Sequence, residues 1–222
     1  MEINADFNVR AAVHAADIAW TPSPTAGVER RMLDRIGDEV ARATSIVRYA
    51  AGSAFPRHVH GGGEEFLVLD GVFSDESGDM PAGTYVRNPP GTAHAPYSTQ
   101  GCVIFVKLRQ FDPSDDRPVR LLAPGLALEP SDDCPGTATA LLHQDARETV
   151  RLEAWAPGAA IARDLPGGGE FLALAGSFAE GGAVFEPQDW LRLPPGARLI
   201  AQAGPDGCRL WSKTGHLADL PG

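Results

Sequence analysis

Three histidines and one glutamate in the first half of this 222-residue chain have the spacing of metal ligands. His58 and His60 lie two residues apart in a predicted strand, so both imidazoles leave the same face of a sheet. Glu64 follows a glycine turn at the start of the next predicted strand, and His94 follows the tight turn at residues 89–91. Three imidazoles and a carboxylate, with no thiolate, suit a divalent first-row metal. We predict one such ion here, either Zn or one of Fe, Mn, Ni and Co.

A metal held in this way keeps one or two positions for water, a substrate or dioxygen. We therefore expect a small-molecule ligand or substrate, although catalysis does not follow from the ligand set alone. Glu65 is the weaker alternative to Glu64, and strand alternation turns it outward if Glu64 faces inward. Phe66 and Val68 share the predicted face of Glu64 and are expected to line the cavity. Four further side chains could clamp a substrate carboxylate, although surface or structural pairing is favoured for each: Arg48, Tyr85, Arg87 and Tyr97.

The elements that must position these side chains are short, β-rich apolar runs punctuated by glycine, proline and aspartate. With 25 glycines, 19 prolines and 43% hydrophobic residues, the chain is typical of an all-β barrel or jelly roll. Residues 28–43 are ambiguous, because a helix interrupted by Gly37 competes there with two strands joined by a turn.

The chain also contains two copies of one pattern. The segment from Gly52 to Gly71 matches the segment from Gly158 to Gly176, and two later blocks match in the same order. We predict an N-terminal metal-binding repeat at residues 1–117 and a degenerate C-terminal repeat at residues 118–222, joined by an exposed connector within residues 112–136. At an offset of 106 residues for the first three ligands and 105 for the last, the counterparts are Asp164, Pro166, Glu170 and Leu199. The second copy is therefore predicted to hold no metal.

The first copy resembles the two cupin motifs. G-x5-H-x-H-x3-E-x6-G runs from Gly52 to Gly71, and G-x5-P-x-G-x2-H runs from Gly83 to His94, with Ser98 in place of a closing asparagine. The run HVHGGGEEFLVLDGVFSDESG is similar to the cupin domain of ChrR-type anti-sigma proteins. The resemblance implies two tandem cupin (jelly-roll) barrels. In that family the residues matching His58, His60, Glu64 and His94 bind zinc.

The resemblance leaves two functions open. One is a dioxygenase-type metalloenzyme, and the other is a ligand-sensing or oxidant-sensing regulator. A helical anti-sigma module is not expected, because fewer than 45 residues precede the first β-rich run and no cysteine precedes Cys102. A non-catalytic binding protein is the third interpretation.

Charge and composition narrow the partners. A formal net charge of −10 disfavours nucleic acid and anionic membranes, and no apolar run approaches a membrane span or signal peptide, so a cytoplasmic location is expected. Cupins often pair through sheet faces, so a homodimer is one expected arrangement. Three histidines and three cysteines are interpreted as structural: His14, His143, His216, Cys102, Cys134 and Cys208.

Overall fold

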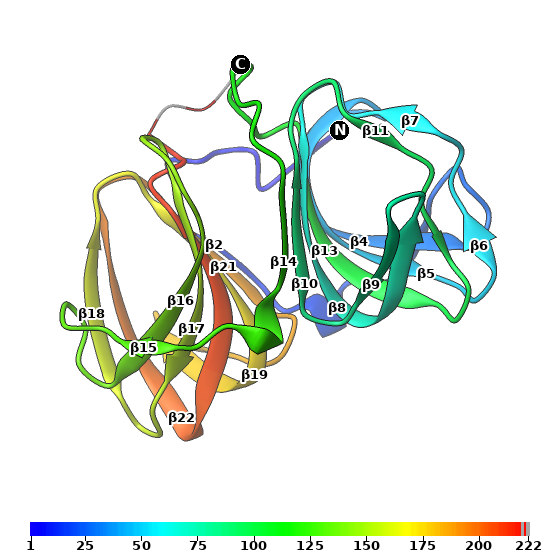
Figure 1. Cartoon of the computed structure of the whole chain (residues 1–222). Coiled ribbons are helices and arrows are strands. Elements are labelled where there is room, and N and C mark those ends of the chain that lie inside the picture. The colour runs from blue at the N-terminus through cyan, green and yellow to red at the C-terminus, as the bar shows by residue number, and fades with distance from the viewer. Residues whose placement is uncertain (219, 221–222) are drawn as a thin grey trace. The chain divides into compact units, whose positions relative to one another are not determined.

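The computed structural model describes residues 1–218 and Leu220, and the regular structure in them is almost entirely β-strand (Figure 1). Two short 3-10 turns, η1 (Ala15–Asp17) and η2 (Ala123–Gly125), are the helical elements of the described residues. Within that part of the chain, no helix has the length and apolar character needed to cross a bilayer. All strand pairings are antiparallel, so the predicted all-β class is confirmed.

The chain divides into two compact units. Unit 1 consists of Met1–Ala5 and Ile18–Pro124, and unit 2 consists of Asp6–Asp17 and Gly125–Leu220. The division after residue 124 lies seven residues beyond the predicted boundary at residue 117, because residues 119–122 form a strand that pairs within unit 1. Residues 11–13 likewise pair with a strand of unit 2, which is why an N-terminal segment belongs to that unit.

Unit 1 is built on one antiparallel sheet with a small second pair of strands. Its strands are β1 (Glu2–Ile3), β3 (Thr21–Pro22), β4 (Val28–Gly37), β5 (Ala41–Tyr49), β6 (Ser53–Ala54), β7 (His58–Val59), β8 (Glu64–Asp75), β9 (Gly78–Pro81), β10 (Thr84–Asn88), β11 (Ala93–His94), β12 (Tyr97–Ser98), β13 (Cys102–Leu108) and β14 (Val119–Leu122). The main sheet has the order β1-β4-β5-β13-β8-β10-β14, and β7 pairs separately with β11.

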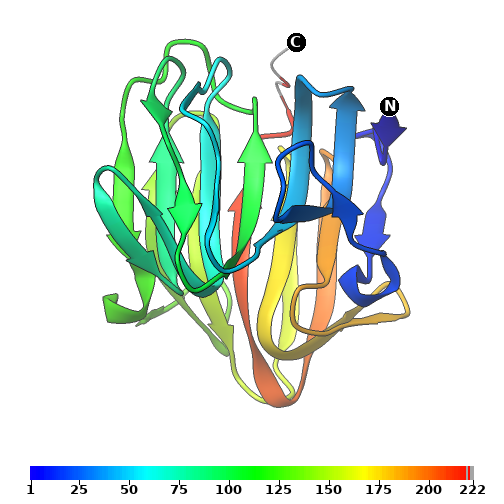
Figure 2. The ribbon, with the colours of Figure 1, turned by 90° about the vertical axis from the view of Figure 1, so that its right-hand side faces the viewer.

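Residues 28–49 form a hairpin rather than a helix. Strands β4 and β5 pair along their lengths and appear as two long blue arrows in Figure 2. Gly37 ends β4 with φ of 109°, where an added Cβ would lie 2.8 Å from the Val40 carbonyl oxygen. The strand interpretation of this ambiguous segment is therefore the one that the structure shows, and its turn needs glycine.

The inner faces of these strands form an apolar core. Ten buried residues make it up: Val28, Tyr49, Phe66, Val68, Phe73, Met80, Val86, Cys102, Ile104 and Val106. They come from β4, β5, β8, β9, β10 and β13, so the strand that begins at Glu64 is packed on its inner face along much of its length. This packing holds the start of β8 in place.

Unit 2 has the same strand order with its own elements. Its strands are β2 (Ala11–Val13), β15 (Glu129–Pro130), β16 (Thr137–Gln144), β17 (Thr149–Trp155), β18 (Ala160–Leu165), β19 (Gly169–Glu180), β20 (Ala183–Phe185), β21 (Trp190–Leu193) and β22 (Ala197–Thr214). The sheet runs β15-β16-β17-β22-β19-β21-β2, which matches the order in unit 1 position by position. The edge strand β2 takes the place that β14 takes in unit 1.

Candidate metal centre

The four side chains predicted to converge lie together in unit 1. Each of His58, His60, Glu64 and His94 offers one ligand atom, and these atoms all lie within 4.8 Å of one another. The β7–β11 pair places His94 directly opposite His58. His60 is the first residue after β7, and Glu64 is the first residue of β8. The β7–β11 pair and the start of β8 therefore hold the four side chains together.

The outer ring nitrogen of each histidine has a hydrogen-bond partner. Nδ1 lies 3.0 Å from the Pro56 carbonyl oxygen in His58, 2.9 Å from Thr92 Oγ1 in His60 and 3.1 Å from Asp75 Oδ2 in His94. The Pro56 carbonyl and the Asp75 carboxylate only accept, so His58 and His94 donate from Nδ1.

Thr92 fixes the third ring in the same way. Its hydroxyl donates to the Pro89 carbonyl at 2.7 Å, so its oxygen is left to accept the Nδ1 hydrogen of His60. The neutral rings therefore all carry their hydrogen on Nδ1 and a lone pair on Nε2. Partners of this kind orient metal-binding histidines in proteins.

The inner nitrogens have no hydrogen-bond partner. Nε2 of His60 and Nε2 of His94 are buried without one, although they lie 3.4 and 3.5 Å from Glu64 Oε2. Neither acceptor nitrogen can share a proton with the ionised carboxylate that it faces, so both stay unsatisfied, which is costly in a buried site. A divalent cation satisfies all of them at once, so the donor set fits a metal.

Burial also keeps one of the rings neutral. Desolvation lowers the pKa of His60, and this effect outweighs the nearby Glu64 carboxylate. A neutral imidazole is the form that binds a metal. Glu64 is held by a further contact, because Asn88 Nδ2 donates to its Oε2 at 3.1 Å.

A turn of three glycines sets the position of Glu64. Gly63 has φ of 77°, and a Cβ there would lie 2.4 Å from the ring of Phe111. A Cβ on Gly62 would meet Arg109 at 2.8 Å. The backbone can turn into β8 under these two side chains only because both residues lack a side chain.

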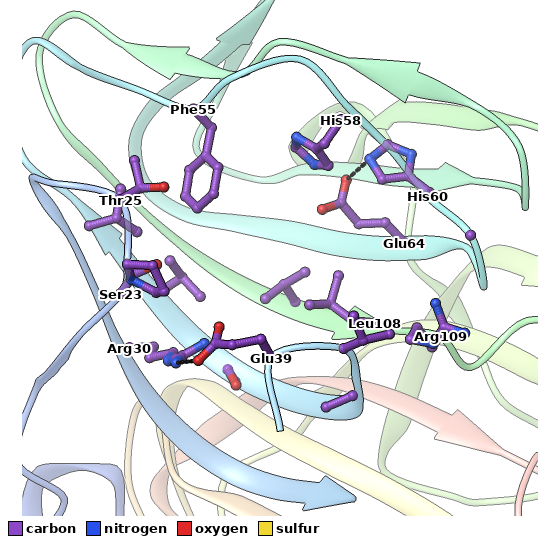
Figure 3. Close-up of a pocket in the computed structure, with 18 of the residues that line it drawn as sticks. Ser23, Thr25, Arg30, Glu39, Phe55, His58, His60, Glu64, Leu108 and Arg109 are labelled. Carbon is purple, nitrogen blue, oxygen red and sulfur yellow. Dashed lines mark hydrogen bonds and ion pairs between the residues drawn. The ribbon is translucent and has the colours of Figure 1, made fainter. Parts of the chain in front are cut away.

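A pocket of about 550 Å³ opens beside the cluster and includes His58, His60 and Glu64 in its wall (Figure 3). Its floor is apolar and comes from β5 and β13, with Val47, Ile104, Val106 and Leu108. Such a volume suits a small organic molecule. The cluster is therefore accessible to a ligand from one side.

Sequence reasoning did not identify most of the polar wall of this pocket. Arg30, Arg35, Glu39, Arg57 and Arg109 all line it. Arg30, Arg35 and Glu39 belong to the β4–β5 hairpin, whose strand character was ambiguous, so nothing in the pattern placed them near the histidines. For Arg109, the one signal in the sequence is the glycine turn before Glu64, because Arg109 packs against Gly61 and Gly62.

None of the four side chains suggested as substrate clamps lines the pocket. Arg48 forms an ion pair with Glu29 on the outside of the hairpin, and Tyr97 is 39% exposed. Tyr85 donates to Glu65 Oε1 at 2.5 Å, and Arg87 Nη2 lies 2.8 Å from Asp115 Oδ2. The favoured interpretation of structural or surface pairing is what the structure shows for Arg48, Tyr85 and Arg87.

One expectation near Glu64 holds and two need correction. Glu65 turns away from the pocket as expected, and it is only 1% exposed because Tyr85 and Arg87 cover and bind it. Phe66 and Val68 belong to the same apolar core as the floor residues Ile104 and Val106, but they do not themselves line the pocket.

Strand register corrects the proposed counterparts in unit 2. Glu65 pairs with Arg87 and Lys107, and Glu170 pairs in the same way with Arg192 and Lys213. Glu170 is therefore the counterpart of Glu65, and an offset of 105 puts Gly169 at the position of Glu64. The sequence alignment was wrong by one residue here, because the second copy has one glutamate where the first has two.

The same offset applies to the histidines. Leu199 pairs with Arg163 across β18 and β22, as His94 pairs with His58, so Arg163 and Leu165 replace His58 and His60 rather than Asp164 and Pro166. Leu165 and Leu199 are buried in the apolar core of unit 2. Apolar packing therefore fills the positions of His60 and His94, while an arginine paired with Glu153 takes that of His58.

The remaining histidines and cysteines have structural surroundings. Each histidine has a carboxylate within reach: His14 with Asp189 at 2.9 Å, His143 with Asp145 at 3.2 Å and His216 with Glu170 at 2.8 Å. The three cysteines are buried and free. Burial raises the pKa of Cys102 to about 11 and that of Cys208 to about 12, so both remain thiols at neutral pH.

Comparison with known proteins agrees with this geometry. Residues 8–112 match the family described as the ChrR cupin-like domain. No curated protein sequence matches the chain.

Several solved structures share the fold at low sequence identity. A protein of Nostoc punctiforme, described provisionally as a dioxygenase, has a TM-score of 0.74 at 16% identity and covers 99% of this chain and 84% of its own. The nickel(II) complex of the bacterial pirin YhhW of Escherichia coli has a TM-score of 0.68 at 15% identity, covering 93% and 99%. Oxalate decarboxylase of Lactobacillus farciminis, as its formate complex, has a TM-score of 0.64 at 11% identity, covering 92% and 86%.

These likenesses concern the fold, since the identities are low. Residues 8–112 therefore match the ChrR cupin-like domain, and the chain as a whole shares the fold of these solved structures.

Proposed function

We propose that unit 1 binds one divalent metal ion through Nε2 of His58, His60 and His94 and the carboxylate of Glu64. The observation that carries this proposal is the pair of buried Nε2 atoms of His60 and His94, which have no hydrogen-bond partner and face Glu64 Oε2 at 3.4 and 3.5 Å. All three Nδ1 atoms are engaged on the outside of the cluster. The residues are thus oriented before any ion arrives.

We further propose that the protein is a metal-dependent oxidoreductase of the dioxygenase type, acting on a small molecule in the adjoining pocket. A bound metal would supply Lewis acidity and a place for dioxygen chemistry. The apolar floor of the pocket would limit water at the reacting end of the substrate. The provisional dioxygenase of Nostoc punctiforme and the nickel-bound pirin support this proposal as relatives in fold only.

The two units are proposed to be tandem cupin barrels, of which only the first binds metal. The matching strand order supports the duplication, and Leu165, Gly169 and Leu199 at the ligand positions support a second barrel without an ion. Its role would be structural.

Elemental analysis of purified protein tests the metal proposal. We expect about one transition metal per chain in the wild type and almost none in His60→Ala. His14→Ala is the matched control, because that imidazole also lies beside a carboxylate but belongs to unit 2. Equal metal content in wild type and His60→Ala would contradict the proposal.

Oxygen uptake tests the enzymatic part. Protein loaded anaerobically with Fe(II) should consume dioxygen with a carbonyl or carboxylate substrate, and the Glu64→Ala variant should not. Absence of uptake across a broad panel, with metal bound, would favour the second candidate below.

A regulatory role is the second candidate, and the match to the ChrR cupin-like domain is the observation that favours it. In this case ligand or oxidant binding would change contacts with a protein partner. A pull-down with sigma factors, with and without bound metal, tests it. Failure to retain any sigma factor in both states would remove the anti-sigma version.

A further inference from the structure

The pocket of unit 1 carries an excess of positive side chains, although the whole chain has a formal charge of −10. Four arginines line it, namely Arg30, Arg35, Arg57 and Arg109. The lining carboxylates are Glu39 and Glu64, so the lining side chains carry an excess of two positive charges before any metal is added. An acidic protein that concentrates positive charge around one pocket favours an anion there.

Arg30 is less engaged with the protein than Arg35. Arg35 donates to the carbonyls of Gly37 and Asp38. In contrast, Arg30 Nη2 contacts only Glu39 Oε1 at 3.3 Å, and its buried Nε has no hydrogen-bond partner.

The counter-ion of Arg30 is easy to displace. The Glu39 side chain is 67% exposed and belongs to the turn between β4 and β5, whereas that of Arg30 is 20% exposed. An ion pair with such an exposed partner contributes little. A ligand carboxylate can therefore replace Glu39 at small cost and bind the guanidinium with two hydrogen bonds.

Arg30 and the metal cluster lie at separate places on the pocket wall. Figure 3 shows Arg30 and Glu39 on one side and His58, His60 and Glu64 on the other. The aliphatic residues of β5 and β13 form the floor between them. A molecule that reaches from one to the other must lay an apolar body on this floor.

We propose that the pocket binds a small carboxylic acid with an apolar body, whose carboxylate displaces Glu39 from Arg30 while its other end points toward the histidine cluster. This inference names the substrate class of the function proposed above and rests on it for the metal end alone. The planar guanidinium matches a carboxylate and a phosphate alike, but the apolar floor disfavours a strongly hydrated dianion, so a carboxylate fits better.

Calorimetric titration with 4-phenylbutyrate and its uncharged amide tests the proposal in the full chain, both metal-depleted and metal-loaded. We expect the wild type to bind the acid about tenfold more tightly than the amide, as for one charge-assisted pair. Arg30→Gln should abolish this preference. Glu39→Gln should strengthen binding of the acid about threefold, because the competing carboxylate is gone.

Arg48→Gln is the matched control, since Arg48 forms a similar ion pair on the same hairpin but does not line the pocket. It should retain the wild-type preference. Equal binding of acid and amide to the wild type, or an acid preference that survives Arg30→Gln, would overturn the proposal. Because the titration is also run without metal, failure of the metal site leaves this result unaffected, and the two proposals fail separately.

Discussion

The Asp75 carboxylate lies 3.1 Å from Nδ1 of His94, on the side of the ring away from Glu64. The same carboxylate group accepts from the backbone and hydroxyl of Ser77 through its other oxygen. Asp75 is the last residue of β8, the strand that begins at Glu64. One strand therefore supplies a proposed ligand at its start and the residue that orients another ligand at its end.

We predict that Asp75→Asn weakens metal binding about 10- to 100-fold without preventing folding. The amide can donate as well as accept, so it no longer selects the Nδ1–H form of His94. Competition titration with a chromogenic chelator measures the affinity. Asp70→Asn, on the exposed side of the same strand, should bind metal as the wild type does. Equal affinities for the two variants would show that Asp75 does not orient the ring.

Adjacent glutamates should give opposite phenotypes. Glu64→Gln should lose metal and remain folded, since its carboxylate faces the cluster. Glu65→Gln should keep metal but lower the free energy of unfolding by about 3 kcal/mol, because it disturbs a buried ion pair with Arg87. Metal content and urea unfolding of the apoproteins separate the two effects. If both variants lost metal equally, the assignment of the ligand to Glu64 would be wrong.

The sequence indicated which four side chains come together because their motifs are local. The spacing within residues 58–64 and the tight turn before His94 can be recognised without the fold, although the β7–β11 pairing is what brings His94 to His58. The apolar floor of the pocket depends on the long-range pairing of β5 with β13, which brings Val47 opposite Ile104. Arg30 enters the wall through β4, and neither contact has a local signal.

The register of the repeat shows a second limit. Glycine blocks align at 106 residues for Gly52 and Gly158, but at 105 for Gly63 and Gly168, which share φ values near 70°. The single-residue difference lies between these pairs. Side chains on a strand alternate, so one residue decides whether a glutamate faces the cavity or the opposite side. The hydrogen-bonded register of the strands shows which face Glu170 occupies, whereas sequence spacing alone does not.

The two units share a buried arginine on the sheet face that points away from the ligand positions. Arg87 stacks on Phe111 at 4.2 Å in unit 1, and Arg192 stacks on Phe7 at 4.0 Å in unit 2. Arg87 and Arg192 occupy the same position in the two units, but Arg87 is covered by a residue after β13 and Arg192 by a residue near the N-terminus. Arg192 also donates to the Asp6 carbonyl, so residues 6–17 belong to unit 2. Both units keep this buried layer, while only unit 1 keeps imidazoles on the other face.

Gly63→Ala should displace Glu64 and weaken metal binding. Its positive φ alone would cost about 1–2 kcal/mol, and its Cβ would also lie 2.4 Å from the Phe111 ring. Gly52→Ala is the control, because Gly52 has φ of 78° and open space around its Cβ position. We expect similar strain in both but loss of metal affinity only in Gly63→Ala, measured by chelator competition. Unchanged affinity would show that the turn tolerates a side chain.

Acid should destabilise unit 2 through Glu153. Complete burial alone would raise the pKa of this carboxyl, but two hydrogen bonds from Arg163 at 2.8 Å, together with Ser212 and Trp155, lower it below the ordinary value of 4.5. Because the folded-state pKa lies below the unfolded one, the ionised group stabilises the fold above about pH 4.5, and this contribution is lost as pH falls through the folded-state value.

Glu153→Gln should therefore be less stable than the wild type at pH 7 by about 3 kcal/mol, as expected when one partner of a buried ion pair is removed. The difference should narrow progressively below pH 4.5. Urea unfolding followed by tryptophan fluorescence between pH 3 and pH 7 measures it, since Trp155 donates to Glu153 and reports on this site. Asp164→Asn, at the 79% exposed neighbour of Arg163, should track the wild type throughout. A gap between wild type and Glu153→Gln that stayed constant over this range would show that the stabilisation does not depend on ionised Glu153.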